Sequence, residues 1–428
     1  MKSNKIYNSL KVTVLAFVAL LASDTLEVSA QNSTVTPYSR FGYGILSDNA
    51  NAAQRSMGGV GYAQRSGRAI NFMNPASYAA IDSLTFLFDM AVNAKGLSTT
   101  DGDETGKNFT GGLDYVTLQF PITRYGGGAV GLKPYSGVGY NFGSEIVNGH
   151  NSREGSGNLS ELFLGVAARP FKNFTVGANF SYLFGTLLND TYVYTEAGNV
   201  SLFERVFEVR DFNVSVGAQY EFNLNADNTI GLGVVYSPKM NFHGHAYGLV
   251  NYEVNSSAAA PDTIGFSKLN GNYQKAETWG AGIAWTFEKR ISLEADFTYQ
   301  PWKDARFGAI EGFDAENSDG QQFDNRWRAA LGFSYMPNPR GSWFKRVNYR
   351  VGGYYSNDYV KVGDNSLREY GVSFGLGLPA PSAKTMVNLA FEYRHRQATP
   401  APLVKENYFM VTVGVNVNEL WFWRNKIR

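Results

Sequence analysis

The chain has 428 residues with 46 glycines, no cysteine and a formal net charge of +1, and aromatic residues make up 15% of it. This composition excludes an intrinsically disordered chain, which would be poor in aromatic residues and rich in charge, and it excludes disulfides and cysteine-ligated metals. The balanced charge provides no basic surface for nucleic acid, and the mean hydropathy of -0.25 by itself suggests a soluble protein.

The first thirty residues have the organisation of a secretory signal peptide. Three lysines precede a nearly unbroken apolar stretch over residues 12–22, and small residues then lead to a cleavage site after Ala30. The stretch is shorter than the ~20 apolar residues of a membrane-spanning helix, so an uncleaved anchor helix is the less favoured alternative. Gln31 stands where a lipoprotein would have cysteine. We expect residues 1–30 to be removed during export.

Residues 31–82 show neither a helical nor an alternating pattern and are rich in glycine. A flexible periplasmic extension is one interpretation of such a segment. It would leave Phe72, Met73 and Tyr78 in water, which is unfavourable for large apolar side chains. We therefore expect this segment to fold against the rest of the chain.

From residue 83 onwards the sequence alternates between apolar and polar residues. Between Asp211 and Phe222 every second residue is apolar, and the same alternation recurs over residues 279–287, 293–300 and 326–335. A period of two with one apolar face predicts β-strands. The predicted strands, an even number that suits a bacterial membrane barrel, are 83–95, 110–121, 127–148, 159–169, 174–195, 202–223, 228–254, 270–288, 290–308, 322–337, 346–360, 366–379, 384–398 and 404–417.

The polar face distinguishes a membrane barrel from stacked soluble sheets. Soluble sheets would present lysine, threonine and glutamate to water, whereas here the polar face mixes glycine, alanine and serine with isolated charges. This inversion predicts an all-β fold, a transmembrane antiparallel β-barrel of about 14 strands with its apolar face toward lipid. The barrel covers residues 83–417, with the N-terminal hatch or plug at 31–82 and a C-terminal periplasmic tail at 418–428.

The connections also fit a barrel in the bacterial outer membrane. Short turns alternate with longer polar loops at 96–109, 149–158, 255–269 and 309–321. Short turns belong to the periplasmic side and long loops to the exterior. Several strands are longer than the ~9–11 residues that cross the bilayer, so we expect the wall to project beyond the outer leaflet.

The segment before the first strand resembles the N-terminal hatch of FadL-type outer-membrane proteins. The resemblance rests on its glycine-rich stretch, on the Asn-Pro-Ala sequence just before the first strand, and on the signal peptide and strand number. That family contains fourteen-stranded barrels for long-chain fatty acids and other hydrophobic compounds, and it includes a PorV-like branch associated with secretion. The hatch and ligand residues that the resemblance implies are Met57, Gly58, Gly59, Phe72, Met73, Asn74, Pro75 and Ala76.

The third predicted strand contains a proline, which cannot donate a hydrogen bond to a neighbouring strand and marks a bulge or an edge. FadL-type proteins have an inward kink in this strand that opens the wall sideways toward the membrane. The resemblance therefore implies a lateral gate, and an ordinary bulge without an opening is the alternative. The gate residues are Lys133, Pro134, Tyr135, Gly137 and Gly139.

Charged side chains gather on the polar face of the late strands. Opposite charges in a lumen can pair across strands and hold a plug in place, which we favour over a ring of charges that selects ions. The predicted lumen charge network is Glu294, Asp296, Arg326, Arg328, Arg350, Glu369, Glu392, Arg394 and Arg396.

The sequence provides little support for an enzyme, a cofactor or a metal site. His243 and His245 share one strand face but lack an evident third ligand. No Gly-x-Ser-x-Gly motif is present. We therefore expect no catalytic residues, no metal and no cofactor.

Two classes of function remain. The first is passive uptake of hydrophobic small molecules of the long-chain fatty acid class. The second is a barrel that does not transport and instead docks protein partners through its loops or its periplasmic face, as a PorV-like accessory for secretion or surface attachment. Both place the chain in outer-membrane lipid, without nucleic acid. A continuous apolar pocket between hatch and wall would distinguish them, because transport needs one and docking does not.

Overall fold

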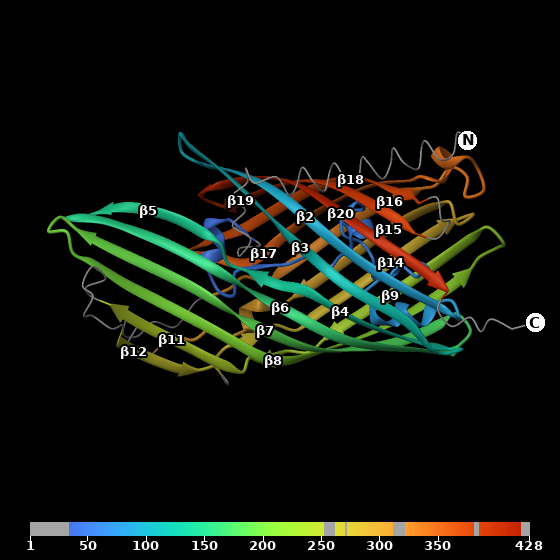
Figure 1. The fold of residues 1–428 in the computed structure, drawn as a ribbon, viewed down its shortest axis with the longest axis horizontal. Helices are drawn as coiled ribbons and strands as arrows, with labels where there is room; N and C mark the ends of the chain where they lie inside the picture. Colours follow the sequence, from blue (N-terminus) through green and yellow to red (C-terminus); the bar gives the residue numbers. More distant parts are fainter. Residues whose placement is uncertain (1–33, 252–261, 270–271, 311–321, 381–384, 421–428) are drawn as a thin grey trace, which may run out of the picture.

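The computed structural model describes residues 34–251, 262–269, 272–310, 322–380 and 385–420 (Figure 1). The predicted signal peptide and most of the predicted tail lie outside these residues. No helix among the described residues is long and apolar enough to cross a membrane.

The wall is a closed antiparallel barrel of fourteen strands, as predicted. It closes because the first wall strand pairs on one side with the second and on the other with the last. The wall strands are β2 (Thr85–Asp101), β3 (Glu104–Thr123), β4 (Gly126–Gly137), β6 (Gly149–Phe171), β7 (Phe174–Thr195), β8 (Val200–Asn223), β9 (Asn228–Ser237), β14 (Thr278–Phe287), β15 (Ile291–Gln300), β16 (Arg326–Tyr335), β17 (Asn348–Val362), β18 (Asn365–Pro379), β19 (Met386–Thr399) and β20 (Lys405–Leu420).

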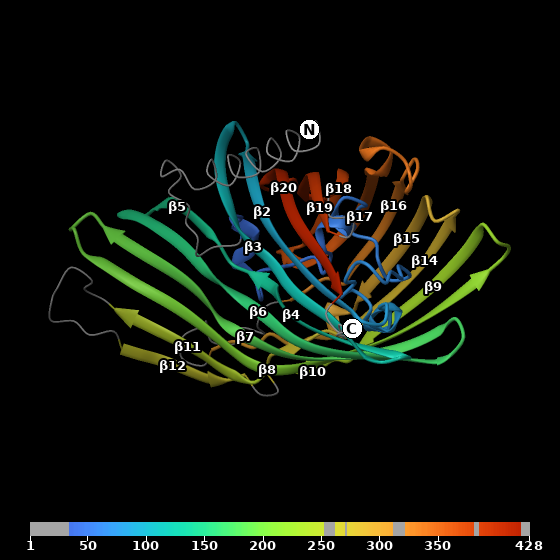
Figure 2. The same cartoon turned by 45° about the vertical axis from the view of Figure 1, so that its right-hand side comes forward.

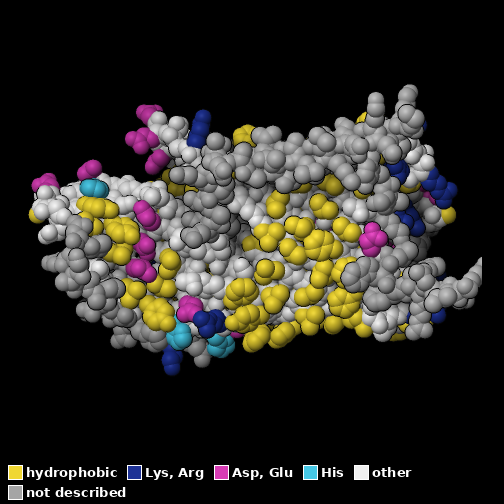
Figure 3. All heavy atoms as spheres, viewed as in Figure 1, with side chains coloured by type: hydrophobic (Ala, Val, Ile, Leu, Met, Phe, Trp, Pro, Cys, Tyr) yellow, Lys and Arg dark blue, Asp and Glu magenta, His cyan; other side chains and the backbone are white. Residues whose placement is uncertain are grey.

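The two faces of the wall differ as the alternation predicts. On β14, Trp279 and Ile283 point outward and are 51% and 47% exposed, whereas Ala284 faces inward and is buried. Outward side chains of this kind gather over the middle of the wall (Figure 3). An apolar band with small or polar residues inside is the surface of a barrel solvated by lipid.

At the extracellular end, where the long connections were predicted, one side of the wall projects well beyond the other (Figures 1 and 2). We call this projection the shelf. It consists of β5 (Tyr140–Ile146), β11 (Gly244–Asn251), β12 (Asp262–Lys268) and the adjoining parts of β6, β7 and β8. Strand β8 has 24 residues, more than the ~9–11 that cross a bilayer, which agrees with the expectation that the wall projects beyond the outer leaflet.

Several predicted boundaries were wrong at this end. The loop at 96–109 is mostly strand, because β2 and β3 continue to a turn at 102–103, and the loop at 149–158 is the start of β6. The strand at 228–254 divides into β9, β10 (Met240–Asn241) and β11, and β10 pairs with β13 (Gln274–Lys275). At the opposite, periplasmic end, the last strand continues to Leu420, which pairs with Thr85, past the predicted end at residue 417. Outside the membrane, strands need no apolar outer face, so alternation cannot locate their ends.

The N-terminal segment, residues 34–84, lies inside the ring of strands (Figures 1 and 2). It contains short elements only: η1 (Pro37–Arg40), β1 (Ile45–Leu46), α2 (Ala52–Arg55) and η2 (Pro75–Ala80). Asn51 and Gln54 form a capping box at α2, and the Asn74 side chain caps η2. These caps allow single helical turns to persist where helical periodicity is absent.

An aromatic cluster fills the extracellular half of the barrel. Tyr43 of the N-terminal segment is fully buried in it and contacts Phe242 at a ring-centroid distance of 4.8 Å and Phe307 at 5.0 Å. Trp302, in η3 (Trp302–Asp304), packs at a tilt against Tyr359, with ring centroids 4.6 Å apart. We call this set the mouth cluster. It ties the shelf, the segment and the late strands together.

Candidate functional site

Glycines allow the Met57–Gly59 turn to touch the wall directly. A Cβ atom on Gly352 of β17 would lie 2.1 Å from the Met57 carbonyl carbon, so no larger residue fits there unchanged. Gly58 and Gly59 have φ values of +73° and +77°, a region that favours glycine. The Gly58 N–H donates to Ser373 Oγ at 2.8 Å. The turn is therefore held by close backbone contact with Gly352 and by a hydrogen bond to the Ser373 side chain.

The second predicted hatch sequence meets the opposite side of the wall. Asn74 Nδ2 donates to the Tyr62 carbonyl at 2.8 Å, and a Cβ on Gly217 of β8 would lie 2.1 Å from Asn74 Oδ1. Phe72 is buried and packs edge-on against Tyr115, with ring centroids 5.1 Å apart. The remaining predicted hatch residues are Met73, which is half-buried, and Pro75 and Ala76, which are buried.

A carboxylate at the centre of the lumen anchors the N-terminal segment to the late strands. Asp48 forms ion pairs with Arg328, with Arg394 at 2.7 Å and with Arg326 at 3.8 Å. Arg328 also donates to the Gly58 carbonyl at 3.0 Å. A single acid of the segment thus neutralises part of the positive charge of three arginines on two wall strands, β16 and β19.

A second ion pair fixes the N-terminal segment to the opposite side of the wall, at β3. Arg55 donates from Nε and Nη2 to the two carboxylate oxygens of Asp114, each at 2.9 Å. Such bidentate pairs combine strength with a fixed orientation. Asp114 is the extra residue of a bulge, where the β2–β3 register shifts between Ala91 and Val92.

The rest of the network links the late strands to one another. Arg396 pairs with Glu369 at 2.6 Å and with Glu406 at 3.5 Å. Arg394 pairs with Glu392, and the Tyr354 hydroxyl donates to Glu369 at 2.7 Å. The structure therefore brings together the predicted residues Arg326, Arg328, Glu369, Glu392, Arg394 and Arg396.

Three predicted members of the network lie apart from it, closer to the periplasmic end. Asp296 accepts from the backbone N–H groups of Gly61 and Tyr62 at 2.6 and 2.9 Å. Glu294 and Arg350 line a cavity and form no ion pair within the described part of the chain. Sequence reasoning missed Asp48, Arg55, Asp114 and Glu406, because the first two lie in an irregular segment and a bulge reverses the alternation at the third.

The third strand leaves its neighbour near the predicted proline. Pairing of β4 with β3 ends at Leu132, opposite Val116, and the end of β4, Ser136 and Gly137, pairs instead with β1 of the N-terminal segment. On its other side β4 stays paired with β6, with a register shift between Pro134 and Ser136. We call the resulting opening the seam. Along it, residues 104–115 of β3 pair only with β2 in the described structure.

The predicted gate residues lie around this departure. Lys133 points inward and pairs with Glu161 at 2.8 Å, while its ammonium also donates to Asn49 of the segment at 2.7 Å. Pro134 lines a chamber of about 80 Å³ behind the seam. The remaining predicted gate residues are Tyr135, which is half-buried, Gly137, which ends β4, and Gly139, which lies between β4 and β5.

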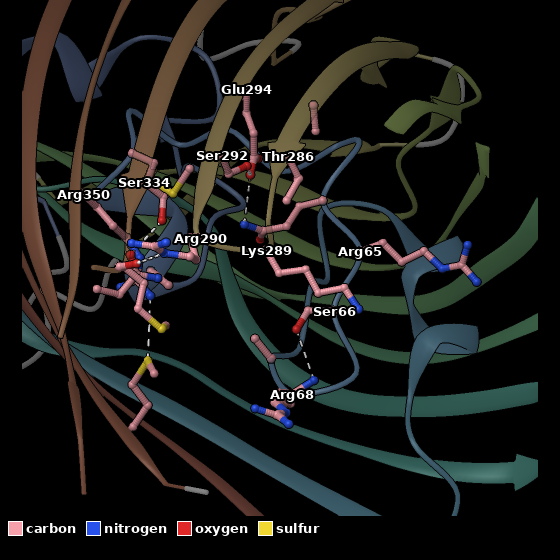
Figure 4. A pocket seen from close by; sticks show the side chains of 18 of the residues that line it. Arg65, Ser66, Arg68, Thr286, Lys289, Arg290, Ser292, Glu294, Ser334 and Arg350 are labelled. Carbon is pink, nitrogen blue, oxygen red and sulfur yellow. Dashed lines mark hydrogen bonds between the residues drawn. The ribbon is translucent and has the colours of Figure 1, made fainter. Parts of the chain in front are cut away.

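Two cavities inside the barrel border the N-terminal segment. The chamber behind the seam is lined by Arg55, Lys95, Asp114 and Arg394. The larger cavity, of about 630 Å³, lies at the periplasmic end between segment and late strands and is lined by charged, amide and apolar side chains (Figure 4). Neither has the apolar lining that a continuous pocket for hydrophobic molecules requires.

The predicted histidine pair does not converge on a metal site. His243 Nδ1 lies 3.1 Å from Asp211 Oδ1, and His245 and Tyr247 are near neighbours on β11, with ring centroids 5.9 Å apart. Within the described ranges, no group of three His, Cys, Asp or Glu side chains is placed to hold a metal ion.

The comparisons with known proteins agree on the fold. The family model described as BamG matches residues 10–428. No curated protein matches the sequence. A FadL homologue of Pseudomonas aeruginosa superposes with a TM-score of 0.64 at 13% identity, covering 88% of this chain and 99% of that one.

Two toluene transporters have similar folds. TodX of Pseudomonas putida has a TM-score of 0.62 at 15% identity, covering 88% of this chain and 100% of its own. TbuX of Ralstonia pickettii has a TM-score of 0.60 at 15% identity, covering 86% and 98%. At such identities the likeness establishes the FadL-type barrel fold, which is an outer-membrane fold.

Proposed function

This chain belongs to the BamG family and has the FadL-type barrel fold, and we propose that it is an outer-membrane channel for passive uptake of hydrophobic small molecules. The observation that carries this proposal is the seam, where β4 leaves β3 and joins β1. Unpaired backbone at membrane depth is costly against lipid and is tolerated where it borders a cavity. A chamber does lie behind the seam, as a lateral exit requires.

In the proposed mechanism the N-terminal segment acts as the hatch. A hydrophobic molecule enters at the mouth cluster, where aromatic side chains offer apolar contacts, and the segment shifts to open a path to the seam. The molecule then leaves sideways near Pro134 into the membrane, down its concentration gradient. Long-chain fatty acids are the substrate class that we propose first, and aromatic hydrocarbons are the comparison, because two structural neighbours are described as toluene transporters.

Uptake of a labelled long-chain fatty acid and of labelled toluene, by cells with and without the protein, tests this function. The seam itself is tested by closing it. The chain has no cysteine, so Leu113→Cys with Pro134→Cys, which both line the chamber, can be bridged by a bis-maleimide. The matched control is Leu162→Cys with Tyr182→Cys, a directly opposed pair in the wall.

We expect bridging at the seam to reduce uptake at least tenfold and bridging at the control pair to leave it unchanged. Equal uptake with and without the protein, for both substrates, would refute the channel. Uptake that persists after bridging would refute the lateral exit alone.

The second candidate is a docking barrel, and the anchoring of the segment favours it. Asp48 and Arg55 fix the segment to both sides of the wall, and the two cavities beside it are lined by charged groups. The edge of β3 that is unpaired in the described structure and the broad shelf would then serve as surfaces for protein partners, since an exposed strand edge can accept a further strand.

Chemical cross-linking in native membranes, followed by identification of the bound proteins, tests the docking function. Partners that cross-link through residues 104–115, together with no uptake, would support docking.

A further inference from the structure

The cavity at the periplasmic end contains two buried charges of opposite sign that do not meet. Glu294 on β15 is 4% exposed and Arg350 on β17 is 7% exposed, and both line the same cavity (Figure 4). Burying an ionised group without a partner is costly, so such groups are normally paired or bound to a ligand. Passive uptake of hydrophobic molecules gives no role to two buried, unpaired charges in one cavity.

Glu294 has one satisfied and one unsatisfied oxygen. Its Oε1 accepts from Ser292 Oγ at 2.8 Å and from Gln64 Nε2 at 3.5 Å. Its Oε2 is buried and has no hydrogen-bond partner in the described structure. One oxygen of this carboxylate therefore lacks the hydrogen bond that would offset its burial in the described structure.

Arg350 has little to compensate its charge. Nη1 donates to Asn388 Oδ1 at 2.8 Å and Nη2 lies 3.8 Å from the sulfur of Met386, both neutral groups. No carboxylate lies within ion-pair distance of it among the residues that the structure describes. The guanidinium thus keeps the capacity to bind an anionic group bidentately.

The strand register separates the two charges by a defined span. Glu294 is opposite Gly332 of β16, and Arg350 is opposite Ser334, so β16 lies between them with an offset of two residues. With strands ~4.8 Å apart and ~3.3 Å per residue, the two Cα atoms are about 12 Å apart. Both residues line the cavity, so the register sets the scale of a ligand that would reach both of them.

We propose that this cavity binds a zwitterionic ligand of the short-peptide class, whose ammonium group meets Glu294 and whose carboxylate meets Arg350. The charged termini of a dipeptide are ~7 Å apart when extended, which lies within the available span. The cavity volume of about 630 Å³ is in the range of small-molecule sites. This site faces the periplasm and is independent of the seam and of hydrophobic uptake.

The entrance of the cavity favours ligands that carry an additional acid. Arg68 and Lys289 are exposed there and form no ion pair in the described part of the chain, whereas Arg65 pairs with Glu221 at 2.7 Å. Lys289 is presented by a tight turn in which Glu288 and Lys289 both have positive φ, +49° and +55°. Exposed cations at an entrance raise the local concentration of anionic ligands, and salt weakens this effect.

Calorimetry on the full chain in detergent tests the site with three probes. Alanyl-alanine carries both charges, N-acetyl-alanyl-alanine only the negative one, and alanyl-alanine amide only the positive one. We expect saturable binding of the first and at least tenfold weaker binding of the other two. Arg350→Gln and Glu294→Gln should each weaken the binding of alanyl-alanine at least tenfold. In Glu294→Gln, the affinities for alanyl-alanine and for N-acetyl-alanyl-alanine should become more similar. Arg124→Gln, an exposed charge in a distant turn, is the matched control.

A further variant keeps the test valid if either charge removal prevents folding. Ser334→Leu places an apolar side chain between the two charges without changing them, and it should also abolish binding. Absence of saturable binding of alanyl-alanine to the folded protein would overturn the proposal. Equal binding of all three probes, or unchanged binding in both charge variants, would overturn it as well.

Discussion

Asp48 is the residue whose loss should do most to release the N-terminal segment. Its side chain is 10% exposed and pairs with Arg328, Arg394 and Arg326. Asp48→Asn keeps the shape and removes the charge, leaving three largely buried guanidinium groups, 12–17% exposed, with less compensation. Breaking a buried ion pair on one side costs about 3–5 kcal/mol. At about 1.4 kcal/mol per tenfold change, the open population of the segment should rise by about 100-fold or more.

Thiol labelling measures this opening directly. Ala50 is 2% exposed, and the chain has no cysteine, so Ala50→Cys provides a single reporter. We expect maleimide to label it about 100-fold faster in the Asp48→Asn background. The matched control is Asp82→Asn, an exposed acid of the same segment with no ion pair in the described structure, which should leave the rate unchanged. A rate within about twofold of the parent, with the barrel still resisting dissociation in SDS, would refute the anchoring role of Asp48.

Three further predictions follow from particular contacts. Gly352→Val should push the segment from the wall, because the new side chain would meet the Met57 carbonyl carbon; we expect a loss of about 1–3 kcal/mol and faster proteolysis of the segment in an intact barrel. Trp302→Ala should remove the centre of the mouth cluster and lower the unfolding free energy by about 3–5 kcal/mol, as measured by urea titration. On the shelf, burial and then the neighbouring Glu204 and Glu154 raise the pKa of Asp190 to about 6, so the folded state binds more protons than the unfolded one between about pH 4 and 6 and stability falls as pH rises through this window. Asp190→Asn should therefore raise the free energy of unfolding, and with it the melting temperature, at pH 8 but not at pH 4. The gain should be less than about 1 kcal/mol because the group is half exposed.

The wall could be predicted from sequence because lipid imposes a repeated rule on it. Every strand that crosses the bilayer must place apolar residues outward at alternate positions, as on β14 and β15. The shelf is not subject to this rule, since its outer face meets water. The start of β6 and the whole of β12 were therefore read as loops.

The predicted charge network was recovered in part. Arg396 pairs with Glu369 because β18 and β19 place these two inward residues directly opposite each other, and alternation reveals which residues face inward. Arg328 of β16 and Arg394 of β19 come together over the Tyr354 ring instead. Their main acidic partner could not be found in this way, because Asp48 lies in a segment without regular structure. Asp114 was hidden by a bulge that interrupts the alternation.

Alternation along the chain is enough to predict the class of the protein: an all-β chain with an apolar face outward, fourteen strands, and a glycine-rich segment before them. Period-two alternation is a local property, and each strand carries it independently. The tertiary structure alone decided which surfaces are brought together. It placed Asp48 among the arginines, ended the β3–β4 pairing at Leu132, and left Glu294 and Arg350 facing one cavity. These features depend on how an irregular segment folds back inside a closed wall. Long-range contacts of that kind produce no periodic pattern of residues in the sequence.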